Sequence, residues 1–251
     1  SGRAGALATP AFFAAAGHDQ IPEAGPLSVS VPGAVAGWVD AHGRYGSMDF
    51  DDLLATGIDY ARNGFAVSTR LAKDFEEQGA NLNQAGLDLY LPNAAAPPIG
   101  SLLRNPALAD SLEIVATQGK EGFYQGSIAA RLSAFITEQG GYLRPEDFAN
   151  HTSTWVTPLR GDYLNHEFVV MPPNTQGVTQ LALFEMAKSH DLQQQGQNSA
   201  DYLHTLIELK KLAFADRDRW VADPELAAVP VPQMLDPVYL QQRALSVDMS
   251  L

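Results

Sequence analysis

Six histidines are the residues best suited to hold a metal ion, and their spacing argues against such a site. They are His18, His42, His151, His166, His190 and His204. No two of them stand four apart with a glutamate between them, the pattern that puts two zinc ligands and a general base on one helix face. His166-Glu167 is more simply a polar turn or the exposed face of a strand. Asp49, Asp51 and Asp52 lack the frame of a calcium loop, so we expect no metal site and no cofactor.

Hydroxyl nucleophiles are the next candidates, because the chain has no cysteine. No serine stands in a Gly-x-Ser-x-Gly turn. Thr175 and the other candidates have no histidine and acid partner that the sequence identifies. The segment Pro32-Gly33-Ala34-Val35-Ala36-Gly37 lacks the third glycine of a dinucleotide fingerprint and the Lys-Ser/Thr of a P-loop. Close helix packing at Gly37 is the simpler explanation, and we predict no catalytic residue in this chain.

The charge balance excludes one large class of partner. Acidic residues number 29 and basic residues 16, which gives a net charge of -13. This charge opposes binding to a phosphate backbone, so we expect no nucleic acid partner. No run of about 20 apolar residues is present, so we expect no membrane span. Asp216-Arg217-Asp218-Arg219 is typical of a solvated or paired charge network on a helix.

Periodicity predicts a mostly helical chain with one pair of strands. Helices are expected over 34–41, 49–63, 68–78, 106–118, 126–139, 177–189 and 200–221. Residues 79–105 are rich in Gly, Asn, Ala and Pro, which predicts a long loop. Between Thr154 and Met171, apolar residues on either side of Arg160-Gly161-Asp162 predict two antiparallel strands. No internal repeat appears, and residues 1–251 are expected to form a single domain.

Short strings of residues follow one another along nearly the whole chain. They include Pro32-Gly33-Ala34-Val35-Ala36-Gly37-Trp38, Ala61-Arg62-Asn63-Gly64-Phe65, Phe123-Tyr124-Gln125-Gly126, Gly140-Gly141-Tyr142-Leu143, Glu146-Asp147-Phe148, Met171-Pro172-Pro173-Asn174-Thr175-Gln176-Gly177 and Ala213-Phe214-Ala215-Asp216-Arg217. Together they resemble the large subunit of the gamma-glutamyltranspeptidase family of N-terminal-nucleophile (Ntn) hydrolases, including its acylase and oxamate amidohydrolase branches. Many strings in one order are far more specific than any one alone.

The resemblance implies an α+β fold with the αββα layers of Ntn hydrolases, of which this chain supplies mainly helices and the strand pair near 154–171. It also implies an autoprocessed proenzyme in which a threonine at the N-terminus of a separate small (beta) subunit is the nucleophile. The α-amine of that threonine, with a pKa of roughly 7.7 to 8.0, would act as its base. The chain is expected to be an internal portion of the large (alpha) subunit, with the small subunit as its partner.

Arg3 is the one substrate-binding residue that the resemblance implies. Gly2-Arg3-Ala4-Gly5-Ala6-Leu7-Ala8-Thr9 aligns with the family segment whose arginine binds a substrate carboxylate. Arginine suits this role because its planar fork donates two parallel hydrogen bonds. The alternative is a solvated arginine near the start of the chain. Ala4 replaces the family's glutamate, which favours a short acid amide such as oxamate over an amino-acid head group.

Two functions therefore remain open from the sequence. The first is cleavage of an amide bond, by hydrolysis or acyl transfer, in a small carboxylate-bearing substrate. The second is a noncatalytic helical binding or assembly module that kept this scaffold and lost the site. A Gly-Asp/His-Thr junction in the residues that follow would favour the enzyme.

Overall fold

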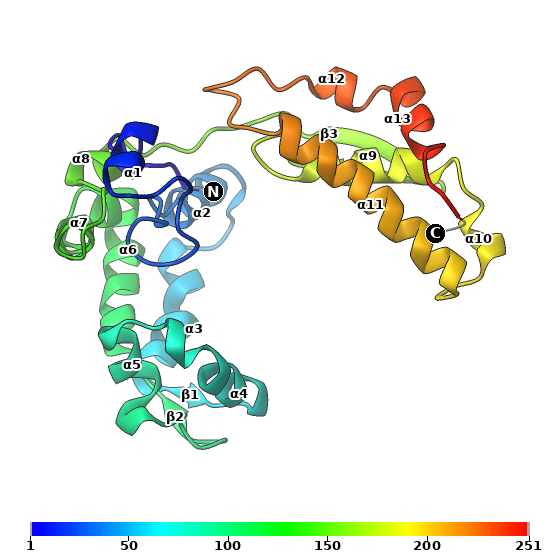
Figure 1. Ribbon diagram of the computed structural model, residues 1–251. Coiled ribbons are helices and arrows are strands. Elements are labelled where there is room, and N and C mark those ends of the chain that lie inside the picture. The colour runs from blue at the N-terminus through cyan, green and yellow to red at the C-terminus, as the bar shows by residue number, and fades with distance from the viewer. Residues whose placement is uncertain (1, 250–251) are drawn as a thin grey trace. The chain divides into compact units, whose positions relative to one another are not determined.

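The computed structural model describes residues 2–249, which form two compact units. One unit ends at Ser153 and the other begins at Thr154 (Figure 1). Helices predominate in both, and the only sheets among the described residues are two separate antiparallel strand pairs, an α+β composition. A compact unit need not fold independently, so a single domain over residues 1–251 stays a prediction.

The first unit contains eight α-helices, two short 3-10 helices and one strand pair among its described residues. These elements are α1 (Pro10–Ala15), α2 (Ala34–Tyr45), α3 (Phe50–Asn63), β1 (Phe65–Ala66), α4 (Thr69–Gln78), η1 (Gly79–Asn81), α5 (Gln84–Tyr90), η2 (Pro92–Ala94), β2 (Leu102–Leu103), α6 (Pro106–Tyr124), α7 (Ser127–Glu138) and α8 (Pro145–Ala149). Strands β1 and β2 pair antiparallel, with Phe65 opposite Leu103.

Local capping residues set several of these helix ends. The Asn105 side chain accepts a hydrogen bond from the Leu108 N–H at the start of α6, where Pro106 occupies the first turn. Ser68 caps α4 in the same way. Gly64 ends α3 with a φ of 97°, a conformation that residues with a side chain rarely adopt. The predicted helices over 49–63 and 68–78 are confirmed.

Helix α6 is the centre of the first unit. Helices α2, α3 and α7 all contact it (Figure 1). Its buried Val115 and Tyr124 join a hydrophobic core that also contains Val35 of α2, Ile128 of α7 and Phe148 of α8. This core also holds α1 against the segment that precedes α8, because Phe13 of α1 packs edge-to-face on Tyr142 with ring centroids 6.0 Å apart.

The second unit places a strand hairpin against helices. Its elements are β3 (Leu159–Tyr163), β4 (His166–Val170), α9 (Gly177–Ala187), α10 (Leu192–Gln195), α11 (Ala200–Trp220), α12 (Val231–Met234) and α13 (Pro237–Ala244). Helix α9 contacts β3, α11 and α13. The core includes Met186 of α9, Leu209 of α11 and Leu240 of α13, each with no exposed side-chain area.

The predicted strand pair between residues 154 and 171 is confirmed, but its turn lies elsewhere. Arg160 and Gly161 belong to β3, opposite Val169 and Phe168 of β4. The connection is Leu164-Asn165, where both residues have positive φ, 46° and 64°. Two consecutive positive φ values are typical of the tight turn that matches the twist of a hairpin.

Four other local predictions are wrong. The helix predicted over 34–41 continues through Gly43 as α2 and ends at Tyr45. The predicted loop over 79–105 contains helix α5, capped by Asn83 and held by stacking of Tyr90 on Phe75 of α4. The helix predicted over 106–118 continues as α6 to Tyr124, with a local interruption at Gly119, whose φ is 57°. Close packing does not explain Gly37, because a Cβ atom built there meets no atom within 4 Å.

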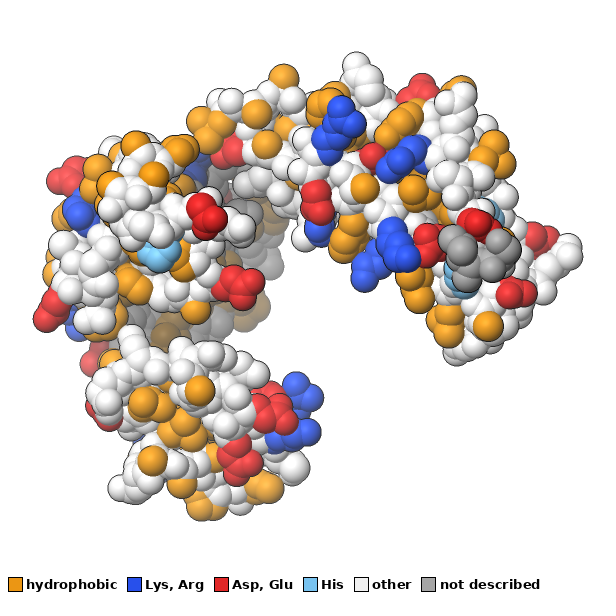
Figure 2. Space-filling view, viewed as in Figure 1, with side chains coloured by type: hydrophobic (Ala, Val, Ile, Leu, Met, Phe, Trp, Pro, Cys, Tyr) orange, Lys and Arg blue, Asp and Glu red, His pale blue; other side chains and the backbone are white. Residues whose placement is uncertain are grey.

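The surface of the second unit carries apolar side chains on helix α11. Leu203 and Ile207 are 45% and 52% exposed, and Figure 2 shows hydrophobic side chains over this helix with charged groups between them. None of the helices within residues 2–249 is long and apolar enough to cross a membrane.

Candidate functional site

Arg3 lies in an extended segment that precedes α1. Its carbonyl oxygen accepts a hydrogen bond of 2.8 Å from the N–H of Val31, and the two residues form an isolated antiparallel bridge. Val31 is 1% exposed, so the bridge ties Arg3 to the core. A Cβ atom at Gly2 would lie 1.9 Å from the Val31 carbonyl oxygen, so only glycine allows this approach. Arg3 is a half-buried residue, and both its carboxylate-binding role and the alternative of a solvated arginine stay predictions.

The residues after Arg3 are held by α8. The Ala6 N–H donates a hydrogen bond of 2.8 Å to a carboxylate oxygen of Asp147. Further along, the Thr9 hydroxyl accepts from the Phe12 N–H at 3.2 Å and caps α1. Asp147 stands in the Glu146-Asp147-Phe148 string, but sequence reasoning assigned it no role. A signal for it was its place in the first turn of a helix that begins at Pro145, where a carboxylate accepts backbone hydrogen bonds.

The same unit contains polar and charged residues that include His151, Tyr124, Lys120 and Asp40. The imidazole of His151 stacks on the Tyr124 ring, with centroids 5.0 Å apart. Burial lowers the pKa of His151 below its usual 6.5, and the positive charges of Arg3 and Lys120 lower it further. Lys120 in turn forms an ion pair with Asp40, and this hydrogen-bonded lysine lowers the pKa of the Asp40 carboxyl group. The positive charge of Arg3 therefore acts on the pKa of His151 in the same direction as burial.

The guanidinium group of an arginine can donate two parallel hydrogen bonds to one carboxylate. The neighbouring Ala4 is exposed and offers no side-chain polar group. Position 4 therefore provides no side-chain partner for an amino group.

The Thr175 hydroxyl group has a structural role. It donates to the carbonyl oxygens of Met171 and Pro172 at 2.9 and 3.0 Å, within the turn that leads into α9. The adjacent Gln176 accepts a hydrogen bond of 2.9 Å from Arg217 of α11. These contacts explain the polar residues of this turn without any nucleophilic chemistry.

The charged run at 216–219 is a paired network, as predicted, but one member is buried. Asp216 is 8% exposed. Both of its carboxylate oxygens accept from the Tyr239 hydroxyl at 3.0 Å, and one accepts from Arg243 at 3.0 Å. Arg217 forms a surface ion pair with Asp218. The run therefore ties α13 to α11.

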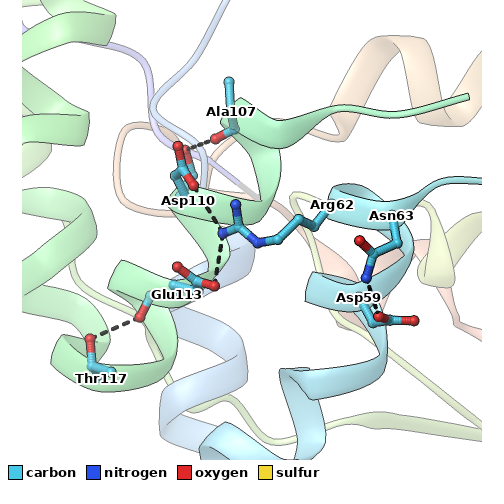
Figure 3. A network of polar contacts seen from close by, with 8 residues as sticks. Asp59, Arg62, Asn63, Ala107, Asp110, Glu113 and Thr117 are labelled. Carbon is cyan, nitrogen blue, oxygen red and sulfur yellow. Dashed lines mark hydrogen bonds and ion pairs between the residues drawn. The ribbon is translucent and has the colours of Figure 1, made fainter.

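Arg62, from another of the recognised strings, also has a structural role. Its guanidinium donates to Asp110 and Glu113 of α6 at 2.9 and 2.8 Å, while the neighbouring Asn63 bonds to Asp59 (Figure 3). These hydrogen bonds raise the pKa of Arg62. Exposed ion pairs of this kind contribute little to stability, so their effect is to orient α3 on α6.

Two surface depressions contain no residue of the Arg3 segment. One, of about 370 Å³, lies beside Arg62 between α3 and α6. The other, of about 930 Å³, lies in the second unit next to Tyr163, His190 and Tyr202. Within residues 2–249, no three His, Cys, Asp or Glu side chains come close enough together to hold a metal ion.

Sequence comparison identifies relatives along the whole chain. A family model described as gamma-glutamyltranspeptidase matches residues 1–250. The oxamate amidohydrolase proenzyme of Klebsiella pneumoniae is 34% identical over 258 residues, covering 99% of this chain and 48% of that protein. The glutathione hydrolase-like YwrD proenzyme of Bacillus subtilis is 33% identical over 247 residues, covering 97% of this chain and 47% of that protein. The chain thus spans about half the length of these curated relatives.

Solved structures agree with this assignment. Gamma-glutamyltranspeptidase of Helicobacter pylori matches with a TM-score of 0.91 and 26% identity, over 98% of this chain and 73% of that chain. Cephalosporin acylase of Bacillus halodurans matches with a TM-score of 0.90 and 32% identity, over 99% of this chain and 48% of that chain. The expected Ntn-hydrolase α+β fold is confirmed. The chain belongs to the gamma-glutamyltranspeptidase family.

Proposed function

We propose that the protein containing this chain cleaves an amide bond of a small carboxylate-bearing substrate, and that Arg3 binds the carboxylate. The observation that carries the proposal is the position of the half-buried Arg3, whose carbonyl oxygen is hydrogen-bonded to the buried Val31. The names of the relatives, which are glutathione hydrolase, acylase and oxamate amidohydrolase proenzymes, support an enzyme over a noncatalytic module.

The nucleophile is proposed to be the N-terminal threonine of a small subunit cut from the same precursor. The chain spans about half of its curated relatives, and its own candidate Thr175 is engaged in a turn. In this arrangement the free α-amine of the threonine takes the hydroxyl proton as the oxygen attacks the amide carbonyl. The α-amine then gives this proton to the amide nitrogen, the C–N bond breaks, and ammonia or an amine leaves an acyl-enzyme. Water or an amine then accepts the acyl group. The large subunit supplies Arg3 to orient the substrate.

The substrate is proposed to be a short acid amide in preference to a gamma-glutamyl compound. Ala4 next to Arg3 provides no carboxylate for an α-amino group. A donor without that amino group should therefore be used at least as well as one that has it. The relative that is an oxamate amidohydrolase supports this preference.

The test compares kcat/KM for oxamate, a glutaryl amide, a gamma-glutamyl amide and a carboxylate-free amide in the processed enzyme. Charge-assisted hydrogen bonds are worth about 1.5 to 3 kcal/mol, so Arg3→Ala should lower kcat/KM for the acid amides by roughly ten- to a hundredfold. Arg3→Lys should restore only part of this, because a point charge cannot reproduce the fork. Self-cleavage should continue. If Arg3→Ala lowers kcat/KM equally for the carboxylate-free amide, Arg3 does not bind the carboxylate. If the wild type strongly prefers the gamma-glutamyl amide, the proposed preference for short acid amides is wrong.

A further inference from the structure

We propose that Asp147 is a positioning residue for Arg3, an inference that rests on the proposed binding of a substrate carboxylate by Arg3. Asp147 does not need to touch the substrate for this role. Its carboxylate group joins the segment that carries Arg3 to helix α8, two parts of the chain that are 141 residues apart.

The two oxygens of Asp147 have separate partners. Oδ1 accepts a hydrogen bond of 2.8 Å from the Ala6 N–H, and Oδ2 accepts one of 2.8 Å from the Arg144 N–H. The Asp147 N–H donates back to the Arg144 carbonyl oxygen at 3.0 Å. Only a carboxylate can accept both backbone hydrogen bonds, because an asparagine has one acceptor oxygen and an NH₂ group that donates.

The surroundings fix the position of this carboxylate. The neighbouring Leu143 and Phe148 have no exposed area, which anchors α8 in the core. On the other side lies Gly5, where a Cβ atom would be 2.7 Å from Asp147 Oδ2 and 2.9 Å from Leu143. The segment therefore lies directly on Asp147, and a larger residue at Gly5 would push it away.

Asp147 and Val31 hold the segment at two points. Val31 binds the Arg3 carbonyl oxygen and Asp147 binds the Ala6 N–H, so the backbone is fixed at Arg3 and three residues later. Without the Asp147 contact, the backbone between Arg3 and helix α1 loses the hydrogen bond that fixes Ala6 and can rotate. Displacement of a binding group by about 1 Å is enough to lose much of its effect.

The test uses Asp147→Asn in the full-length processed enzyme, with Glu146→Gln as the matched control. Glu146 is an exposed carboxylate in the same helical turn with no contact to the Arg3 segment among the described residues. We expect Asp147→Asn to speed backbone hydrogen exchange in residues 4–9. It should raise KM for a glutaryl amide about three- to tenfold and change kcat for that substrate less than about twofold. For the carboxylate-free amide, both KM and kcat should change less than about twofold. The control should change neither measurement.

A double-mutant cycle separates this inference from the proposed function. In the Arg3→Ala background, Asp147→Asn should change kcat/KM for the glutaryl amide by less than about twofold, because the group that it positions is gone. Should Asp147→Asn not fold, Gly5→Ala replaces it and should give the same selective rise in KM.

Three outcomes would overturn the inference. Unchanged hydrogen exchange in Asp147→Asn would show that Asp147 does not hold the Arg3 segment. An equal loss of kcat/KM on the glutaryl amide and the carboxylate-free amide would show a structural role only. So would an undiminished effect of Asp147→Asn in the Arg3→Ala background. If Arg3→Ala itself lowers activity equally on both substrates, the proposed function fails, and the positioning role fails with it even where exchange shows a tether.

Discussion

The Tyr124 hydroxyl group caps helix α2 from α6, 88 residues further along the chain. It accepts a hydrogen bond of 3.1 Å from the Ala36 N–H and donates one of 2.6 Å to the Pro32 carbonyl oxygen. Gly33, at the N-cap position of α2, has no side chain to do this. Burial of the phenol raises the pKa of Tyr124, so the hydroxyl stays protonated and can make both bonds.

Replacing Tyr124 with phenylalanine should therefore destabilise the protein. Ala36 has no exposed area and Tyr124 is 3% exposed, so the freed N–H and carbonyl groups would be left without partners away from water. Such losses cost about 1 to 3 kcal/mol. Denaturant or thermal unfolding of the variant measures this, with Tyr60→Phe as the control because Tyr60 is 55% exposed. Equal stability of Tyr124→Phe and wild type would contradict the capping role.

The pKa of His151 should depend on Arg3. It lies below 6.5 in the folded protein, first because of burial and then because of the Arg3 and Lys120 charges. Arg3→Gln removes one of these charges, so the pKa should rise toward 6.5 without reaching it. An NMR titration of the His151 ring protons measures the change. The control is Arg70→Gln, because the Arg70 side chain on α4 is 81% exposed. Equal shifts of the His151 pKa in the two variants would show that this pKa does not depend specifically on Arg3.

Stability should follow the same titration. Between its folded pKa and pH 6.5, His151 is protonated in the unfolded chain but largely neutral in the folded chain. Its contribution to the free energy of unfolding is therefore fully present above pH 6.5. Its contribution decreases as the pH falls from 6.5 toward the folded pKa. Since Arg3→Gln narrows the difference between the two pKa values, the loss of stability on acidification should be smaller in the variant. Unfolding midpoints measured at pH 7.5 and 5.5 in both proteins check this, and an unchanged pH dependence would count against it.

The purified 251-residue chain should be catalytically silent by itself. Its candidate hydroxyl, that of Thr175, donates to two backbone carbonyl groups and does not face a base among the described residues. We expect no chromophore release from a gamma-glutamyl anilide and no ammonia from oxamate. Turnover that disappears with Thr175→Ala would show that the chain carries its own nucleophile.

The isolated chain should also bind a hydrophobic dye. Leu203 and Ile207 are about half exposed on α11, and apolar patches on a helix face favour association. Replacing both with glutamine should lower dye binding, and addition of the small subunit should lower it for the wild type. Leu226→Gln is the control, since that residue is 87% exposed outside any helix. A monodisperse monomer that binds no dye would refute the expectation.

The sequence by itself determined the family and most ends of the seven helices that it predicted, whereas α1, α5, α8, α10, α12 and α13 were not predicted. Capping by Asn105, Ser68 and Gly64 acts within one turn, so these residues are enough to begin or end a helix. The strand pair was also readable, but its turn was not, because Arg160-Gly161-Asp162 resembles a turn locally. Helix α5 was missed for a related reason, since stacking of Tyr90 on Phe75 helps to hold it.

The tertiary structure alone decided what surrounds Arg3. The resemblance pointed to Arg3, but the two residues that hold its segment are distant in sequence: Val31 binds Arg3 from 28 residues away, and Asp147 binds Ala6 from 141 residues away. No local propensity encodes which of the exposed or buried carboxylates will meet the Ala6 N–H, because that depends on how α8 packs in the core. Glu146 and Asp147 are adjacent and chemically alike, yet packing brings only Asp147 to the segment.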